Sequence, residues 1–168
     1  ALPPNMLFTT QYDVILADKS VSVVFIAVPP NQHYTVALQA LHHGKHVWLE
    51  KPGCVTSEEF GQLKAYAEAA QRILHIDFVA LFSPKIMAMR DHIQQYVNVV
   101  EQHRLVAIRE NKKRIGADGH NALDLVYDLG VHDLSIIKFF YPTLKANEVS
   151  LQFKRVSEDE VGHLPFHK

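Results

Sequence analysis

An almost unbroken apolar run, ended by two prolines, is the feature that most constrains the fold of this 168-residue chain. The run reads Val21-Ser22-Val23-Val24-Phe25-Ile26-Ala27-Val28, and Pro29-Pro30 follows it. β-Branched and apolar residues in a continuous run are typical of a strand that is buried on both faces, which is the usual environment in a parallel sheet. The run therefore predicts an α/β fold.

The segments that follow alternate between helix and strand patterns. They predict a helix over 34–41, a strand over 45–50, a helix that opens at Thr56 and a strand over 73–79. Gly44 fits the left-handed position that follows a helix. Thr56 and Glu59 have the spacing of a capping box. Strand, helix, strand, helix, strand predicts an α/β layer of parallel strands.

The second half of the chain changes character. Its patterns predict a helix over 84–99, a strand over 104–114, a long helix over 121–140 and a strand over 148–156. Two strands that flank a helix indicate the start of an α+β domain. We therefore expect two partial domains, one over 1–83 and the other over 84–168.

Composition excludes several classes of protein. The 17 basic and 18 acidic side chains give a net charge of −1, so we expect neither nucleic acid nor an anionic membrane surface as a partner. No apolar run approaches the roughly 20 residues that a membrane-spanning helix needs. Cys54 is the single cysteine, which excludes an internal disulfide and a cysteine-based zinc site. A reducing cytoplasm is the expected location.

Two polar segments follow the first two predicted strands. Asn31 and His33 follow the first strand, and Glu50-Lys51-Pro52 ends the second. Ligands of open α/β sheets bind at the carboxyl ends of the strands, so both segments are candidate binding residues. A lysine there can act as a proton donor, because partial burial lowers the pKa of an ammonium group. The alternatives are an ordinary βα loop and a charged pair that only terminates a strand.

Asp128 and His132 lie four residues apart on the long predicted helix and therefore share one face. A carboxylate beside an imidazole can fix its tautomer and prepare it for acid–base work. The same pair could hold a metal ion or form a simple surface contact. A metal-dependent hydrolase is the weaker interpretation, because no third ligand has convincing spacing, and we predict no metal.

Three blocks in this order resemble the Gfo/Idh/MocA oxidoreductase family. They are Val24-Phe25-Ile26-Ala27-Val28-Pro29-Pro30-Asn31-Gln32-His33, then Gly44-Lys45-His46-Val47-Trp48-Leu49-Glu50-Lys51-Pro52, then Asp128-Leu129-Gly130-Val131-His132-Asp133. The second half is most similar to the virulence-factor MviM group, through Phe82-Ser83-Pro84 and residues 127–133. The resemblance covers about residues 10–156.

The resemblance implies an incomplete Rossmann-type parallel sheet, followed by the start of an α+β domain whose open sheet supports substrate binding and homo-oligomer contacts. It implies oxidation or reduction of a carbon–oxygen bond in a sugar-like or cyclitol substrate with NAD or NADP. Lys51 would orient or protonate the substrate oxygen, His132 would be its acid–base partner and Asp128 would support His132. The residues expected along the nicotinamide and its ribose are Pro29, Asn31, His33, Glu50 and Lys51. The alternative within the same family is a dinucleotide-binding regulator or sensor without turnover.

The chain departs from the family pattern in three places. None of its 7 glycines forms a G-x-G-x-x-G loop. We therefore expect a middle fragment whose phosphate-binding loop would precede Ala1, and which binds NAD(P) weakly on its own. Ala80 and Leu81 stand where many members carry an arginine, and Ser135 stands where a second aspartate is common.

Overall fold

The computed structural model describes residue 6, residues 8–96 and residues 130–145. The elements in chain order are α1 (Tyr12–Ala17), β1 (Val23–Ile26), α2 (Pro30–His42), β2 (His46–Glu50), α3 (Ser57–Ala69), β3 (Leu74–Asp77), the 3₁₀ helix η1 (Val79–Phe82), α4 (Pro84–Tyr96) and α6 (Val131–Phe140). The predicted strands over 104–114 and 148–156, and the predicted helix before residue 130, lie outside the described residues.

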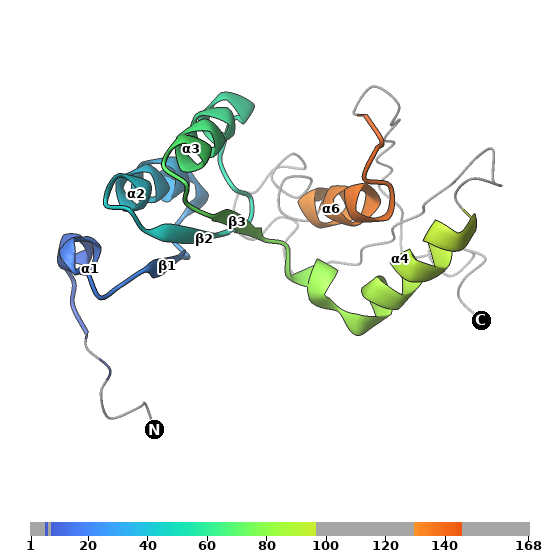
Figure 1. The fold of residues 1–168 in the computed structure, drawn as a ribbon, viewed down its shortest axis with the longest axis horizontal. Helices are drawn as coiled ribbons and strands as arrows, with labels where there is room; N and C mark the ends of the chain where they lie inside the picture. Colours follow the sequence, from blue (N-terminus) through green and yellow to red (C-terminus); the bar gives the residue numbers. More distant parts are fainter. Residues whose placement is uncertain (1–5, 7, 97–129, 146–168) are drawn as a thin grey trace, which may run out of the picture.

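The three strands form one parallel sheet in the order β1-β2-β3. Val24 pairs with Val47, and Val47 pairs in turn with Leu74. Each strand is joined to the next by a helix, which is the arrangement that the alternating patterns predict (Figure 1). The α/β prediction is therefore confirmed, and the fold is of the Rossmann type.

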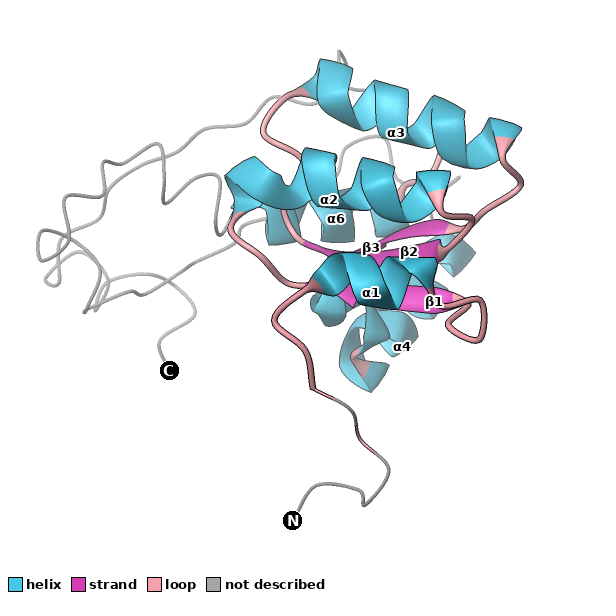
Figure 2. Ribbon diagram, turned by 90° about the vertical axis from the view of Figure 1, so that its left-hand side faces the viewer, coloured by secondary structure: helices cyan, strands magenta, loops and turns pink. Residues whose placement is uncertain are grey.

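Helices α2 and α3 lie side by side over one face of the sheet (Figures 1 and 2). The core between them and the strands is apolar, because each element turns its apolar stripe inward. α1 packs onto the same layer through Leu16, and its Tyr12 hydroxyl donates to Gln39 Oε1 of α2 at 2.6 Å. The buried core residues are Leu16, Ile26, Ala37, Ala40, Leu41, Val47, Leu49, Leu63 and Ala67.

Two local predictions about helix ends are confirmed. The Thr56 side chain accepts a hydrogen bond from the backbone N–H of Glu59, and the Glu59 carboxylate accepts one from the backbone N–H of Thr56. This capping box fixes the start of α3. Gly44 follows α2 with φ +72°, a conformation that a residue with a Cβ adopts only at a cost.

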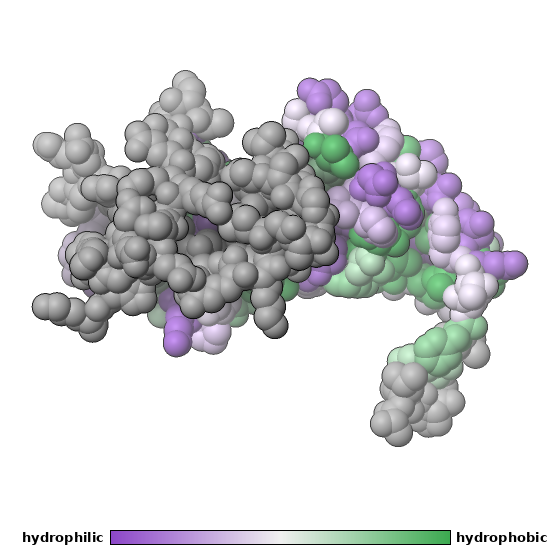
Figure 3. Space-filling model, turned by 180° about the vertical axis from the view of Figure 1, so that it is seen from behind, coloured by the Kyte–Doolittle hydropathy of each residue, from purple (hydrophilic) through white to green (hydrophobic). Residues whose placement is uncertain are grey.

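The expectation that the first strand is buried on both faces is wrong. Val23 and Phe25 of β1 are 55% and 58% exposed, and Trp48 of β2 lies on the same face. The physical reason is that α2 and α3 both cover the opposite face. On this face the short helix η1 brings the Phe82 ring to 6.3 Å from that of Trp48, and Val23 and Phe25 stay largely exposed. Figure 3 shows the result, with hydrophilic surface over the helices at the top and hydrophobic patches below them, at the level of the sheet.

Helices α4 and α6 pack against each other and against η1. Arg90 of α4 lies over the ring of Phe139 with 4.7 Å between its guanidinium carbon and the ring centroid, and Phe140 is buried. The expected division of the chain between residues 83 and 84 falls between η1 and α4, and it stays a prediction. Within the described ranges, no helix has both the length and the apolar character to cross a membrane.

Candidate functional site

The carboxyl ends of the three strands form the edge where the sequence analysis places a ligand. β1, β2 and β3 are parallel, so all three end on the same side of the sheet. In Figure 1 this side faces η1 and α6, and the end-on view of Figure 2 places α6 behind the sheet and α2. The candidate residues therefore lie on the strand-end loops and on the start of α6.

Glu50 and Lys51 lie at the end of β2. Both side chains are half-buried, and Glu50 Oε2 accepts a hydrogen bond from the backbone N–H of Lys51 at 3.0 Å. This bond holds the Glu50 carboxylate against the turn that leaves the strand. The peptide bond between Lys51 and Pro52 is cis.

His33 connects the loops that follow β1 and β2. Its ring lies on the first turn of α2 and is only 1% exposed. Nδ1 lies 2.8 Å from the carbonyl oxygen of Pro52, and Nε2 lies 2.8 Å from that of Val28. Both partners are acceptors, so a neutral imidazole donates to one of them and an imidazolium donates to both. The ring thus ties the β1–α2 loop to the β2–α3 loop.

Pro29 and Asn31 lie at the amino end of α2 and are exposed. Pro29 is the N-cap, and its carbonyl accepts a hydrogen bond from the backbone N–H of Gln32 at 2.8 Å. The 13-residue helix directs the positive end of its dipole to this edge of the sheet. Asn31 therefore presents a polar side chain where a partial positive charge already favours electron-rich ligand atoms.

Asp77 was not among the candidates that the sequence analysis selected. It is the last residue of β3, it is 8% exposed, and it is the register partner of Glu50. Register partners on neighbouring strands are about 4.8 Å apart, so two acidic residues stand together at the carboxyl edge. The available signal was a single acidic residue inside the mostly apolar stretch 73–79.

His132 lies on the first turn of α6, and its carbonyl accepts a hydrogen bond from the Ser135 hydroxyl at 2.7 Å. Its side chain is half-buried. α6 contacts η1, the element that directly follows β3. Asp128 lies outside the described residues. The structure therefore brings Glu50, Lys51 and His33 to one edge and sets the helix of His132 beyond it, and their joint action stays a prediction.

Two further observations concern the ionisable side chains of the described residues. Burial raises the pKa of the Cys54 thiol to about 11, with Glu59 adding to the effect, so the thiol is protonated near neutrality. Across the portion of the chain that the structure describes, no group of three His, Cys, Asp or Glu side chains could hold a metal ion.

Comparison with known proteins identifies this edge as part of a nucleotide-binding fold. Residues 4–78 match the sequence profile of an oxidoreductase family with an NAD-binding Rossmann fold. The matched segment belongs to a Gfo/Idh/MocA oxidoreductase domain. The family is one of NAD(P)-binding Rossmann oxidoreductases.

Individual relatives agree with this assignment. An uncharacterised oxidoreductase of Schizosaccharomyces pombe is 33% identical over 149 residues, covering 83% of this chain and 39% of the relative. A UDP-N-acetylglucosamine 3-dehydrogenase of Acidithiobacillus ferrooxidans is 28% identical over 124 residues, covering 74% of this chain and 36% of the enzyme. The crystal structure of an NAD-binding protein from Listeria innocua aligns with a TM-score of 0.59 and 26% identity, covering 79% of this chain and 40% of that one.

The chain spans about two fifths of the length of these relatives. The match to a Rossmann fold directs attention to the carboxyl edge, because open α/β sheets bind their ligands there. The roles of individual residues at that edge do not follow from the match and are proposals.

Proposed function

We propose that the full-length protein carrying this sequence is an NAD(P)-dependent oxidoreductase that acts on a carbon–oxygen bond of a sugar-like or cyclitol substrate. The observation that carries the proposal is the placement of Glu50 and Lys51 at the carboxyl edge of a parallel sheet in a Gfo/Idh/MocA domain. The sugar-like substrate is supported by the relative named as a UDP-N-acetylglucosamine 3-dehydrogenase.

The residues present at this edge suit the nicotinamide half of the cofactor. Asn31 offers an exposed amide and Glu50 a half-buried carboxylate, and these can exchange hydrogen bonds with a ribose or a carboxamide. Pro29 would pack beside them. When bound, the cofactor would accept or donate the hydride.

Lys51 would orient the substrate oxygen and supply or receive its proton, because an ammonium group can both donate a hydrogen bond and transfer a proton. His132 would act as its acid–base partner from α6, and Asp128 would support the imidazole. We assign His33 a positioning role, since both of its ring nitrogens already lie 2.8 Å from carbonyl oxygens within the protein.

Three finer assignments belong to the same proposal. The second half of the protein would form an MviM-like α+β domain, copies of the protein would associate as a homo-oligomer, and the cytoplasm would be the location. The small-molecule substrate would be the only partner besides the cofactor and the other copies.

The test is a comparison of Lys51→Ala with Lys64→Ala in the full-length protein. Lys64 is a matched control, because it is an exposed lysine on α3 whose nearest ion-pair partner, Glu68, is 3.9 Å away. We expect Lys51→Ala to lower kcat by about 10²–10⁴-fold, because a positioned general acid or base usually accelerates a reaction by that factor. The Kd for NADH should change by no more than about threefold, because the phosphate contacts dominate dinucleotide affinity.

Candidate sugars and cyclitols would be screened with NAD and NADP by following absorbance of the reduced cofactor. Equal turnover by the Lys51 and Lys64 variants would remove Lys51 from the reaction. Tight NADH binding without turnover of any candidate would favour the regulator of the same family.

A further inference from the structure

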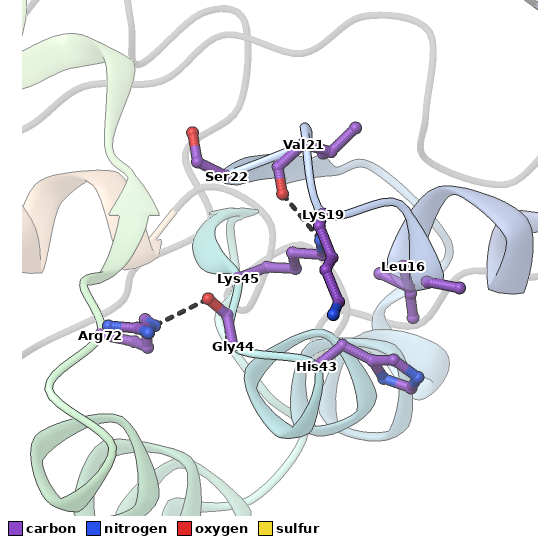
Figure 4. A pocket seen from close by; sticks show the side chains of 9 residues that line it. Leu16, Lys19, Val21, Ser22, His43, Gly44, Lys45 and Arg72 are labelled. Atoms are coloured by element: carbon purple, nitrogen blue, oxygen red, sulfur yellow. Dashed lines mark hydrogen bonds between the residues drawn. The ribbon is translucent and has the colours of Figure 1, made fainter.

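A hollow lies at the other edge of the sheet, where the strands begin (Figure 4). Its volume is about 380 Å³, which falls within the range of small-molecule sites. Its walls come from the end of α1, the segment before β1, the turn between α2 and β2, and the segment before β3. Three separate stretches of the chain, within 16–22, 43–45 and at Arg72, therefore converge on one space.

The walls of the hollow are positively charged. Lys19, Lys45 and Arg72 contribute three cations and His43 an imidazole, and no lining residue is acidic. Asp18 stands beside Lys45, and its pKa is lowered by hydrogen bonds from Ser20 and by the charge of Lys45. One carboxylate thus balances one of three cations, which leaves a local positive excess in a chain whose net charge is −1.

Two of the cations are held in place by backbone carbonyls. Lys45 is 4% exposed, and its ammonium donates to the carbonyl oxygens of Asp18 and Val21, the latter at 2.7 Å. Arg72 Nε donates to the carbonyl oxygen of Gly44 at 2.7 Å (Figure 4). An ammonium has three N–H groups and a guanidinium five, so both side chains keep donors beyond these bonds.

Lys19 differs from Lys45 and Arg72. It is exposed, and it makes no hydrogen bond or ion pair within the described part of the chain. Lys45 and Arg72 are explained by the backbone carbonyls that they bind just after α1 and α2, at the edge where α3 also ends. That explanation accounts neither for Lys19 nor for the hollow between the three cations.

We propose that this hollow binds a small phosphorylated molecule. Its phosphate group would take Lys19, the remaining N–H of Lys45 and the Nη2 group of Arg72, because a dianion is bound best by several charge-assisted hydrogen bonds. Leu16 and Val21 supply apolar wall for a compact carbon body.

This site is separate from the nicotinamide edge. The strands are 4 or 5 residues long, so the two edges of the sheet are about 13–17 Å apart. A ligand in the hollow would join α1 to the α2–β2 turn and to β3, and would stabilise the amino-terminal part of the domain by mass action. The proposal does not depend on the oxidoreductase activity.

The test uses inorganic phosphate as the probe on the 168-residue chain. Thermal unfolding would be followed in phosphate and in sodium chloride of equal ionic strength, and affinity would be measured by calorimetric titration. The variants are Lys19→Gln and Arg72→Gln, with Lys64→Gln as the control that removes one exposed lysine from α3. We expect phosphate to raise the Tm above that in chloride. Lys19→Gln should weaken phosphate binding about three- to tenfold and Lys64→Gln less than twofold. Of these two lysines, only Lys19 would contact the phosphate directly.

The Lys19 variant keeps the test decisive if Arg72→Gln fails to fold, because Lys19 makes no bond that the described structure needs. Equal Tm in phosphate and chloride would overturn the proposal. Equal weakening by the Lys19 and Lys64 substitutions would also overturn it, since it would reveal general attraction of anions to surface lysines. NADH affinity of the full-length protein serves as a separate readout, and we expect Lys19→Gln to leave it unchanged.

Discussion

Replacing His33 with phenylalanine tests whether the ring holds the two strand-end loops together. Phenylalanine keeps the ring volume and removes both nitrogens, so no large cavity forms. A neutral imidazole donates to one of the carbonyl oxygens of Val28 and Pro52 and an imidazolium donates to both, so one or two hydrogen bonds of 2.8 Å would be lost. Each unsatisfied buried group costs about 1–3 kcal/mol. Both carbonyl residues are half-buried, so water replaces part of the loss and the lower half of this range applies.

We therefore expect the His33→Phe substitution to reduce the free energy of unfolding by about 1–4 kcal/mol in total, from one lost hydrogen bond to two. With a urea m-value of about 1–2 kcal/mol/M, the unfolding midpoint should fall by roughly 0.5–4 M. Urea titration followed by far-ultraviolet circular dichroism measures this change.

The matched control is His43→Phe, because His43 is exposed and its Nδ1 only donates to the carbonyl oxygen of Gln39 within the same helix end, at 2.8 Å. This control should lose less than about 1 kcal/mol. Equal midpoints for the two variants would refute the idea that His33 ties the loops together. In the full-length protein, His33→Phe should also weaken NADH binding, whereas a residue with only a stabilising role would leave the affinity of the folded fraction intact.

Three further predictions follow from local geometry. Thr56→Ala removes the capping box of α3 and should lower the free energy of unfolding by about 1 kcal/mol in urea titration, whereas Thr35→Ala on the exposed surface of α2 should cost nothing. Gly44→Ala should cost about 1 kcal/mol in the same assay, because φ is +72° at that position, and an unchanged midpoint would contradict the assigned turn. The Cys54 thiol, with a pKa of about 11 against 9.0 for an ordinary thiol, should carry about 100-fold less thiolate at pH 8 and react correspondingly slowly with a disulfide reagent. The rate should rise with pH until about 11, and rapid reaction at pH 7 would show that the thiol is not buried.

Local signals explain why the α/β layer could be predicted from the sequence. The run that became β1, the capping box at Thr56 and the turn at Gly44 each depend on neighbours within a few residues. What failed was the burial of β1 on both faces, because that depends on whether a remote segment packs over Phe25. An apolar run reports that a strand is compatible with burial, and it does not report which of its two faces a helix covers.

The candidate site also has features that the sequence could predict and features that it could not. The position of Lys51 at the carboxyl edge follows from strand direction alone, so the sequence could predict it. The function of His33 as a link could not be predicted, since its partners, Val28 and Pro52, lie 5 and 19 residues away and become neighbours only when β1 and β2 pair. Asp77 was missed for the same reason, because its significance comes from its register with Glu50 across two strands. A buried histidine with both nitrogens bound and an acidic residue in register with another are properties of the assembled sheet. The histidine link depends on the pairing of β1 with β2, and the acidic pair depends on the pairing of β2 with β3. A variant that shifts the β1–β2 register should therefore break the His33 link and leave Glu50 beside Asp77.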